Sequence, residues 1–130
     1  MQWNVDGSTV NATGFTSSPQ SANNLVTLTG QVTAGAALTS QVMLDVPKAV
    51  GTYTFGPSAL ASGTYIVRNP TTQAYYAGST PGSGTVTGAG TIVVTELTST
   101  SISGTFIFTG INGNTGDAKS VSNGRFFIGL

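Results

Sequence analysis

The segments of this sequence that favour β-strands are short, and clusters of Gly, Ser, Asn and Pro separate them. Thr, Val, Ile, Tyr and Phe dominate these segments, as expected for strands on a half-buried pleated surface. The clearest alternation of apolar and polar residues runs from Leu38 to Val46, where Pro47 ends it. Leu38, Val42 and Val46 also fit a helical spacing, but the longer alternation favours a strand.

A second recurring feature is a Gly-Thr step followed by an aromatic or aliphatic residue. Each Gly can end a turn, and each β-branched Thr can open a strand. Because the steps are irregularly spaced, they argue against a β-solenoid or a propeller, which need a constant period. The five steps are Gly51-Thr52-Tyr53, Gly63-Thr64-Tyr65, Gly84-Thr85-Val86, Gly90-Thr91-Ile92 and Gly104-Thr105-Phe106.

The pattern predicts a single all-β domain over residues 1–130, with about nine to ten short strands and no significant helix. We expect an antiparallel β-sandwich or a flattened β-barrel. Loops are predicted at 15–24, 78–84 and 110–119. The predicted strands are 2–6, 8–13, 24–33, 38–46, 51–55, 63–68, 72–77, 90–97, 101–109 and 120–130, with a strand start at 85–87.

The carboxyl-terminal strands carry the most detailed prediction. Residues 90–97 and 101–109 form a hairpin, and the three-residue step from Val94 to Leu97 indicates a β-bulge near Thr95-Glu96. In the last strand we expect Phe126, Ile128 and Leu130 to point inward and Phe127 to point outward. These side chains would form much of the core.

Charge is scarce, and this scarcity limits the possible functions. Only 6% of the residues are charged, against roughly 25% in a typical soluble domain, and the net charge is zero. Four scattered Lys and Arg residues do not suit binding to nucleic acid or to an anionic membrane. No apolar run reaches the roughly 18 residues that a membrane-spanning helix needs. The N-terminus has no basic and apolar signal pattern, so we expect a mature domain or export by another route.

The sequence offers little for catalysis or metal binding. It has no His and no Cys, which removes the commonest general base, disulfides and Cys-type metal sites. Asp6, Asp45, Glu96 and Asp117 are not paired by spacing, although a glycosidase needs two carboxylates across a cleft. We therefore expect no enzyme activity, no cofactor and no metal.

One segment, Asn112-Gly-Asn-Thr-Gly-Asp117, offers oxygen ligands for calcium. It has a single carboxylate, so its affinity for calcium would be poor. The preferred interpretation is a Gly/Asn turn in which Asp117 pairs locally with Lys119.

Several segments resemble an uncharacterised family of small secreted β-domains found mainly as lipoproteins of Bacteroidota. The carboxyl-terminal half carries most of the resemblance, and the opening Trp3-Asn-Val-Asp-Gly7 and the central Gly51-Thr-Tyr-Thr-Phe55 extend it. The resemblance implies an all-β extracytoplasmic domain and supplies no catalytic residue. The chain lacks a lipobox cysteine, which departs from the lipoprotein pattern. The carboxyl-terminal motifs are Gly90-Thr-Ile-Val-Val-Thr-Glu-Leu97, Ile102-Ser-Gly-Thr-Phe-Ile-Phe108 and Val121-Ser-Asn-Gly-Arg-Phe-Phe-Ile128.

Two binding hypotheses follow from the residues. Tyr75 and Tyr76 could stack against a glycan, although adjacent residues of a strand point to opposite faces, so only one can be exposed; core or surface packing is the alternative. Thr-x-Thr pairs could present an array to ice or another ordered surface, but their irregular spacing speaks against it. These pairs are Thr27/Thr29, Thr52/Thr54, Thr85/Thr87 and Thr98/Thr100.

Self-association is the hypothesis with the strongest physical motive. Sheet edges are normally protected by charges, Pro or bulges, yet residues 24–33 and 90–95 contain no Lys or Arg. Either the sheet closes on itself, or another copy or partner covers an edge. We therefore expect a non-catalytic extracellular or cell-surface domain with a structural or adhesive role, which could self-associate as a subunit of an appendage, coat or particle. The alternative is a small glycan-binding or surface-ligand-binding module that uses exposed aromatic residues.

Overall fold

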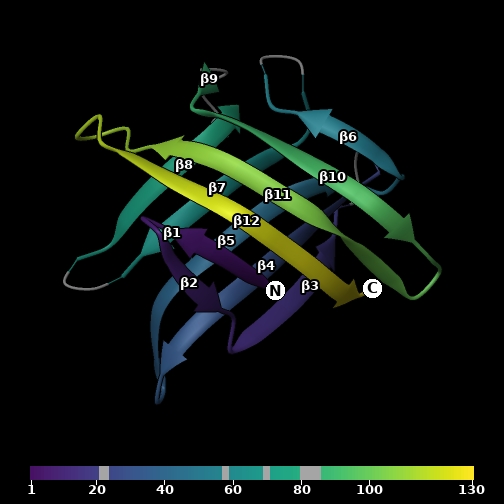
Figure 1. Ribbon diagram of the computed structural model, residues 1–130, viewed down its shortest axis with the longest axis horizontal. Helices are drawn as coiled ribbons and strands as arrows, with labels where there is room; N and C mark the ends of the chain where they lie inside the picture. The colour runs from purple at the N-terminus through teal and green to yellow at the C-terminus, as the bar shows by residue number, and fades with distance from the viewer. Residues whose placement is uncertain (21–23, 57–58, 69–70, 80–85) are drawn as a thin grey trace.

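The computed structural model describes residues 1–20, 24–56, 59–68, 71–79 and 86–130, and it is all-β (Figure 1). These residues contain no helix. The predicted loop at 78–84 and the predicted strand start at Thr85 lie largely outside the described residues. Within them the strands are β1 (Gln2–Val5), β2 (Ser8–Asn11), β3 (Gly14–Pro19), β4 (Leu25–Ala34), β5 (Ala37–Pro47), β6 (Gly51–Thr54), β7 (Ser62–Val67), β8 (Gln73–Ser79), β9 (Val86–Thr87), β10 (Ala89–Leu97), β11 (Ser101–Ile111) and β12 (Ala118–Gly129).

All of these strands belong to one antiparallel arrangement that forks at β11. The main path runs β2-β1-β12-β11-β8-β7-β5-β4-β3, while β10 joins β11 to β6 and β9 pairs with β8. The link from β11 to β8 is a single pair, Ile111 with Tyr76. In Figure 1 the branch that contains β10, β11, β12, β1 and β2 crosses over the branch that contains β7, β5, β4 and β3. The sheet is thus curled over itself as a half-barrel, which confirms the predicted all-β antiparallel fold.

The strand β3 replaces part of the loop predicted at 15–24. It pairs with β4 along its whole length, from Gly14 with Gln31 to Pro19 with Val26. Its side chains do not alternate between buried and exposed positions, so its sequence carries no period-two signal. The Ser17 hydroxyl donates to the carbonyl of Gly129 at 2.7 Å, which ties this edge strand to the end of β12 in the other layer.

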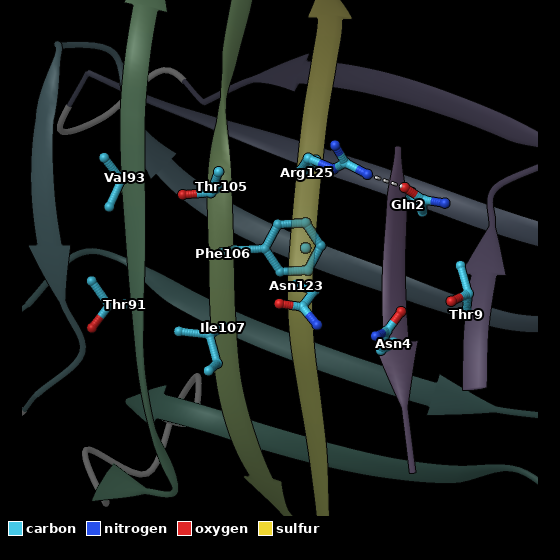
Figure 2. Close-up of a pocket in the computed structure, with 11 residues that line it drawn as sticks. Gln2, Asn4, Thr9, Thr91, Val93, Thr105, Phe106, Ile107, Asn123 and Arg125 are labelled. Atoms are coloured by element: carbon cyan, nitrogen blue, oxygen red, sulfur yellow. Dashed lines mark hydrogen bonds between the residues drawn. The ribbon is translucent and has the colours of Figure 1, made fainter. Parts of the chain in front are cut away.

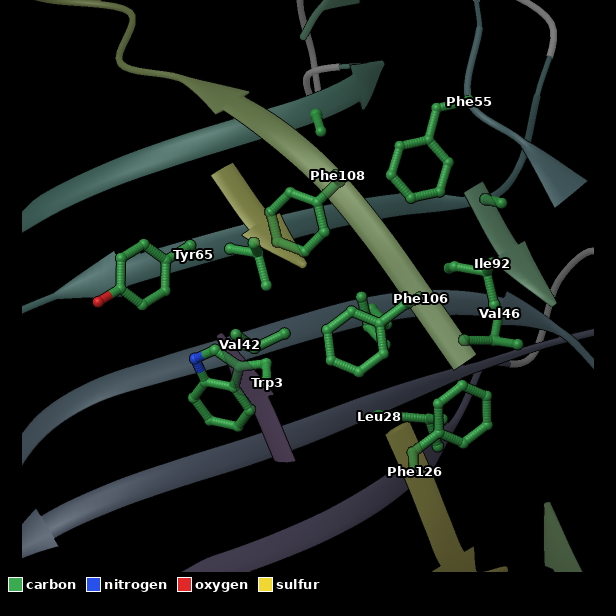
Figure 3. Packing of buried hydrophobic residues seen from close by; sticks show 14 of the residues in the cluster. Trp3, Leu28, Val42, Val46, Phe55, Tyr65, Ile92, Phe106, Phe108 and Phe126 are labelled. Carbon is green, nitrogen blue, oxygen red and sulfur yellow. The ribbon is translucent and has the colours of Figure 1, made fainter. Parts of the chain in front are cut away.

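The core lies between the two layers and is made of side chains from nearly every long strand (Figure 3). Strand alternation explains its membership, because every second residue of β5 and β11 faces inward. Phe106 is central: its ring lies 6.4 Å from Phe108 and 6.3 Å from Phe126, centroid to centroid. The largest fully buried side chains are Trp3, Phe108, Leu28, Leu44, Ile92, Ile102, Ile128, Val26, Val42, Val46, Val94 and Val121.

The β10–β11 hairpin has the predicted register and the predicted bulge. Ile92 pairs with Phe106 and Leu97 with Ile102, and the register shifts between Val94 and Glu96. The extra residue changes the phase of the strand, so that Leu97 returns toward the core after a three-residue step.

The last strand differs from the prediction at its end. Phe126 and Ile128 are buried and Phe127 is exposed, as expected, but Leu130 is 43% exposed. The strand ends at Gly129, and the backbone amide of Leu130 donates to the carbonyl of Thr100. Leu130 therefore lies past the strand, where alternation no longer sets its direction.

Close approach of backbones makes Gly104 a sensitive position. A Cβ added there would overlap the carbonyl oxygen of Val93 and lie 2.8 Å from the Phe126 ring. At Gly14, in contrast, nothing lies within 4 Å of an added Cβ. We predict that Gly104→Ala lowers the free energy of unfolding by about 2 kcal/mol, because the added methyl group must push the β10 backbone at Val93 away from β11. Gly14→Ala should change it by less than about 1 kcal/mol. Urea denaturation followed by tryptophan fluorescence measures both, and equal midpoints for the two variants would contradict the packing argument.

Candidate functional site

The tyrosine pair singled out in the sequence is divided between the two faces of β8. Tyr75 is 7% exposed, and its ring stacks on Tyr65 in the core at a centroid distance of 6.2 Å. Tyr76 is half-buried on the opposite face, where it borders a depression of about 240 Å³. A glycan could not stack on Tyr75 without entering the core. Of the two candidate residues, only Tyr76 is therefore placed to touch a ligand.

The same depression contains Asp45, whose carboxylate is already engaged. Its Oδ1 accepts hydrogen bonds from Gln20 at 2.8 Å and from Thr27 at 2.7 Å. Its Oδ2 accepts one from the Ser62 hydroxyl at 3.2 Å. These bonds connect the segment after β3 with β4, β5 and β7. Asp45 thus holds strands together on the outer face of this layer.

A larger groove of about 680 Å³ lies on the outer face of the other layer. Figure 2 shows its side chains projecting from β10, β11, β12, β1 and β2. Carboxamide and hydroxyl groups predominate, with two aliphatic side chains, one phenyl ring, one glycine and one guanidinium, and none of the lining residues is acidic. The lining residues are Gln2, Asn4, Thr9, Thr91, Val93, Thr105, Phe106, Ile107, Asn123, Gly124 and Arg125.

A β-bulge in the middle of β12 shapes this groove. Between Val121 and Gly124 the strand takes three steps, where β11 takes two from Phe108 to Phe106. The register with β1 shifts at the same place. Asn123, inside the bulge, has a φ of 48°, a left-handed conformation that few residues other than Gly adopt readily. The extra residue bends β12 and turns the Asn123 side chain outward into the groove.

Gly124 contributes backbone to the lining of the groove, because its side-chain position faces the core. A Cβ added at Gly124 would lie 2.5 Å from the Phe106 ring, which packs directly beneath it. The bulge therefore shapes the outer face by bending β12, while the missing side chain of Gly124 lets the Phe106 ring pack tightly against the inner face of the strand.

A second depression of about 450 Å³ continues the first along β12. The two share Gln2, Thr105 and Arg125, and the second extends to Phe127. Phe127 is 66% exposed, an unusual position for a large apolar side chain, and it pairs across the sheet with Ser103. We call the two depressions together the β12 groove. Its outward-facing row on β12 is Asn123, Arg125 and Phe127.

Arg125 lies where the two depressions meet. Its Nη2 donates to the Gln2 Oε1 at 2.7 Å (Figure 2). Its partner across the sheet on β11 is Thr105. Both neighbours are neutral, so neither compensates the positive charge of the guanidinium, and most of its five N–H donors are left for other partners.

The segment from Asn112 to Asp117 forms a turn, and its side chains serve that turn. The Oδ1 of Asn112 accepts from the backbone amides of Asn114 and Thr115 at 2.8 and 3.2 Å. Its Nδ2 donates to Gln73 at 2.7 Å. In the described part of the chain, no group of three or more acidic residues could hold a metal ion.

Lys119 pairs with Asp6 rather than with Asp117, which corrects the expected local pairing. The distance from Nζ to Oδ2 is 2.7 Å. The cause is topological: β1 pairs with β12, with Val5 opposite Val121, so the turn after β1 meets the start of β12. The hydrogen bond to Asp6 raises the pKa of the Lys119 ammonium, and burial raises the pKa of the Tyr65 hydroxyl.

The described Thr-x-Thr pairs are not brought together into one array. Thr27 and Thr29 lie on β4 and Thr52 and Thr54 on β6, and these strands are not neighbours. The pair at 98 and 100 belongs to the turn between β10 and β11, while Thr85 lies outside the described residues. In the part of the chain that the structure describes, no helix is long and apolar enough to cross a membrane.

Sequence reasoning did not find the β12 groove, although two signals pointed to it. Phe127 was expected to face outward, which leaves a large aromatic side chain in solvent. Val121 and Phe126 are both buried although they are an odd number of positions apart in the strand, which requires a phase change between them.

Asn123 offers a test of how the bulge shapes the site. Asn123→Gly should keep the fold and leave the free energy of unfolding equal or slightly higher, because Gly adopts a positive φ freely. Asn123→Ala should lower it by about 1 kcal/mol, because Ala bears the left-handed strain without compensation. Thermal and urea unfolding measure the difference. Equal stability of the two variants would show that the left-handed backbone at Asn123 costs nothing.

The comparisons with known proteins give one match. A family model described as "Domain of unknown function (DUF6252)" matches residues 1–129. This match supports the resemblance of the chain to an uncharacterised family. No curated protein and no solved structure matches the chain.

Proposed function

The chain belongs to the DUF6252 family, and we propose that it is a non-catalytic adhesive β-domain that binds a surface glycan in the β12 groove. The observation that carries this proposal is the 66% exposure of Phe127 at the end of a groove lined by carboxamides and hydroxyls. Burying a Phe side chain is worth roughly 1.5–3 kcal/mol, and here much of that free energy remains to be gained on binding.

The chemistry of the groove suits a sugar. The apolar face of a sugar ring can pack on an aromatic ring, as on Phe127. The amide groups of Gln2, Asn4 and Asn123 both donate and accept hydrogen bonds, which matches the paired donor and acceptor character of sugar hydroxyls. A few fixed polar groups beside an apolar surface are typical of ligand sites.

A binding role fits the groove better than catalysis. Neither depression of the β12 groove is lined by a carboxylate, and a Thr hydroxyl is a weak nucleophile without an adjacent base. Asp45 lies in the layer opposite the groove, where it accepts hydrogen bonds from three side chains of that same layer. Asp6 is paired with Lys119. These engagements support a structural role for both carboxylates.

We place this activity outside the cytoplasm, at the cell surface. The resemblance to a family of secreted lipoproteins supports this location. So does a surface that carries few charges and many hydroxyl groups, because the domain would meet its ligand through hydrogen bonds and apolar contacts rather than through a strong field.

Substitution of Phe127 tests the proposal. On a glycan array, the purified domain should bind at least one glycan, and Phe127→Ala should weaken that binding about tenfold or more because the stacking surface is lost. Phe127 is exposed, so this variant should keep the fold, which circular dichroism can check. Phe15→Ala is the matched control, because Phe15 is half-exposed on β3, away from the groove, and it should leave binding unchanged.

Tyr76→Ala separates the two possible sites. It should leave binding unchanged if the glycan occupies the β12 groove. Loss of binding in Tyr76→Ala with full binding in Phe127→Ala would move the site to the depression beside Asp45 and refute the groove.

Self-association is a second candidate function, favoured by the composition of the edge strands. Within the described residues, β2, β3 and β6 each pair with a single strand, and none of the three contains a charged residue. Such strands lack the lysines that commonly prevent edge-to-edge pairing. Their short length, four residues in β2 and β6, limits the area that another copy could cover.

Light scattering after size-exclusion chromatography tests this second role. A self-associating subunit should show a mass that rises with concentration from the micromolar to the millimolar range. Asn11→Lys on β2 and Thr52→Lys on β6 should lower that mass by placing charge on the exposed edges. A constant monomeric mass over the whole range would exclude assembly through the edges.

A further inference from the structure

Arg125 is the one charged residue that lines the β12 groove, and it has no acidic partner among the described residues. All four carboxylates of the chain are described, and the ion pair found among these residues joins Lys119 to Asp6. Arg125 donates to the neutral Gln2 amide at 2.7 Å, and its cross-strand neighbour Thr105 is also neutral. A cross-strand neighbour of opposite charge would stabilise such a position; because Gln2 and Thr105 are neutral, the positive charge of Arg125 remains without compensation.

From this geometry we propose that the β12 groove selects glycans that carry an acidic group, with Arg125 as the specificity-determining residue. The inference rests on the proposed glycan-binding function and adds the chemical class of the ligand. A guanidinium offers a planar fork of donors that matches the two oxygens of a carboxylate or sulfate. The bond to Gln2 orients the guanidinium and still leaves donors for a ligand.

The spacing along β12 fits an extended saccharide. Arg125 and Phe127 are two residues apart and face the same side, so their Cα atoms are separated by about 7 Å. This separation is comparable to the size of one sugar unit. A sugar packed on Phe127 would thus place an acidic group of its own or of the next unit at Arg125. The amides of Asn123 and Asn4 continue the groove beyond it.

A pair of matched polysaccharides tests the inference by biolayer interferometry. Polygalacturonate carries a carboxylate on each unit, and its fully methyl-esterified form carries none. Dextran sulfate and dextran form the equivalent pair for sulfate. We expect the acidic member of at least one pair to bind about tenfold more tightly than its neutral counterpart, and the pair that shows this difference identifies the acid.

Arg125→Gln should weaken binding of the acidic polymer about tenfold, because a charge-assisted hydrogen bond is lost, and leave binding of the neutral polymer unchanged. Arg68→Gln is the matched control: Arg68 is exposed after β7 and does not line the groove, so its removal should change neither. Arg125→Lys keeps the charge but not the planar fork of donors. Its affinity for the acidic polymer should lie between those of the wild type and Arg125→Gln. Unchanged thermal unfolding of each variant would confirm that the fold is kept.

The outcomes separate this inference from the proposed function. Equal binding of acidic and neutral polymers, lost in Phe127→Ala but kept in Arg125→Gln, would overturn the acidic preference and leave glycan binding intact. Equal losses in Arg125→Gln and Arg68→Gln would show a general effect of charge and would also overturn it. Absence of binding to any of the four polymers, together with no binding on the glycan array, would overturn both proposals.

Discussion

One extra residue in β12 governs both faces of the layer that carries the groove. On the inner face, Val121 and Phe126 are both buried, although an odd spacing in a regular strand would place one of them in water. The bulge at Asn123 corrects the phase, so both ends of the strand contribute to one core. On the outer face the same bulge bends the strand above Phe106 and sets Asn123 beside Arg125 and Phe127. The left-handed backbone at Asn123 is the local cost of this arrangement.

The few charges of the chain are used sparingly, and their placement defines the surface. Asp6 and Lys119 connect the β1–β2 turn to the start of β12, and Asp45 connects strands on the outer face of the opposite layer. Each of these groups has a partner within the fold. Among the described residues the Arg125 guanidinium bonds to the neutral Gln2 amide and to no carboxylate, which leaves the groove with a net positive charge. Arg68 also has no ion pair among the described residues, but it does not line the groove, so Arg125 is the guanidinium that a ligand in the groove would meet.

Some details of the fold could be predicted because they leave a local pattern. The bulge in β10 is visible in the three-residue step from Val94 to Leu97, where both ends are aliphatic. The bulge in β12 also inserts one residue and shifts the register. Its sequence does not show this, because the inward position after the bulge is Gly124, which has no hydrophobic side chain to mark the phase. The strand β3 was missed for a related reason: at the edge of the sheet its residues are largely exposed on both faces, so its pairing with β4 leaves no alternation in the sequence.

The sequence by itself determined the all-β class, the principal strands, the outward direction of Phe127 and the opposite directions of Tyr75 and Tyr76, because period-two alternation is a property of each strand alone. Only the tertiary structure decided which tyrosine entered the core, that Asp6 rather than Asp117 pairs with Lys119, and that residues from β1, β2, β10, β11 and β12 share one groove. These features depend on which strands become neighbours. Pairings such as that of β1 with β12, at opposite ends of the chain, are set by the closure of the core and leave no local mark in the sequence.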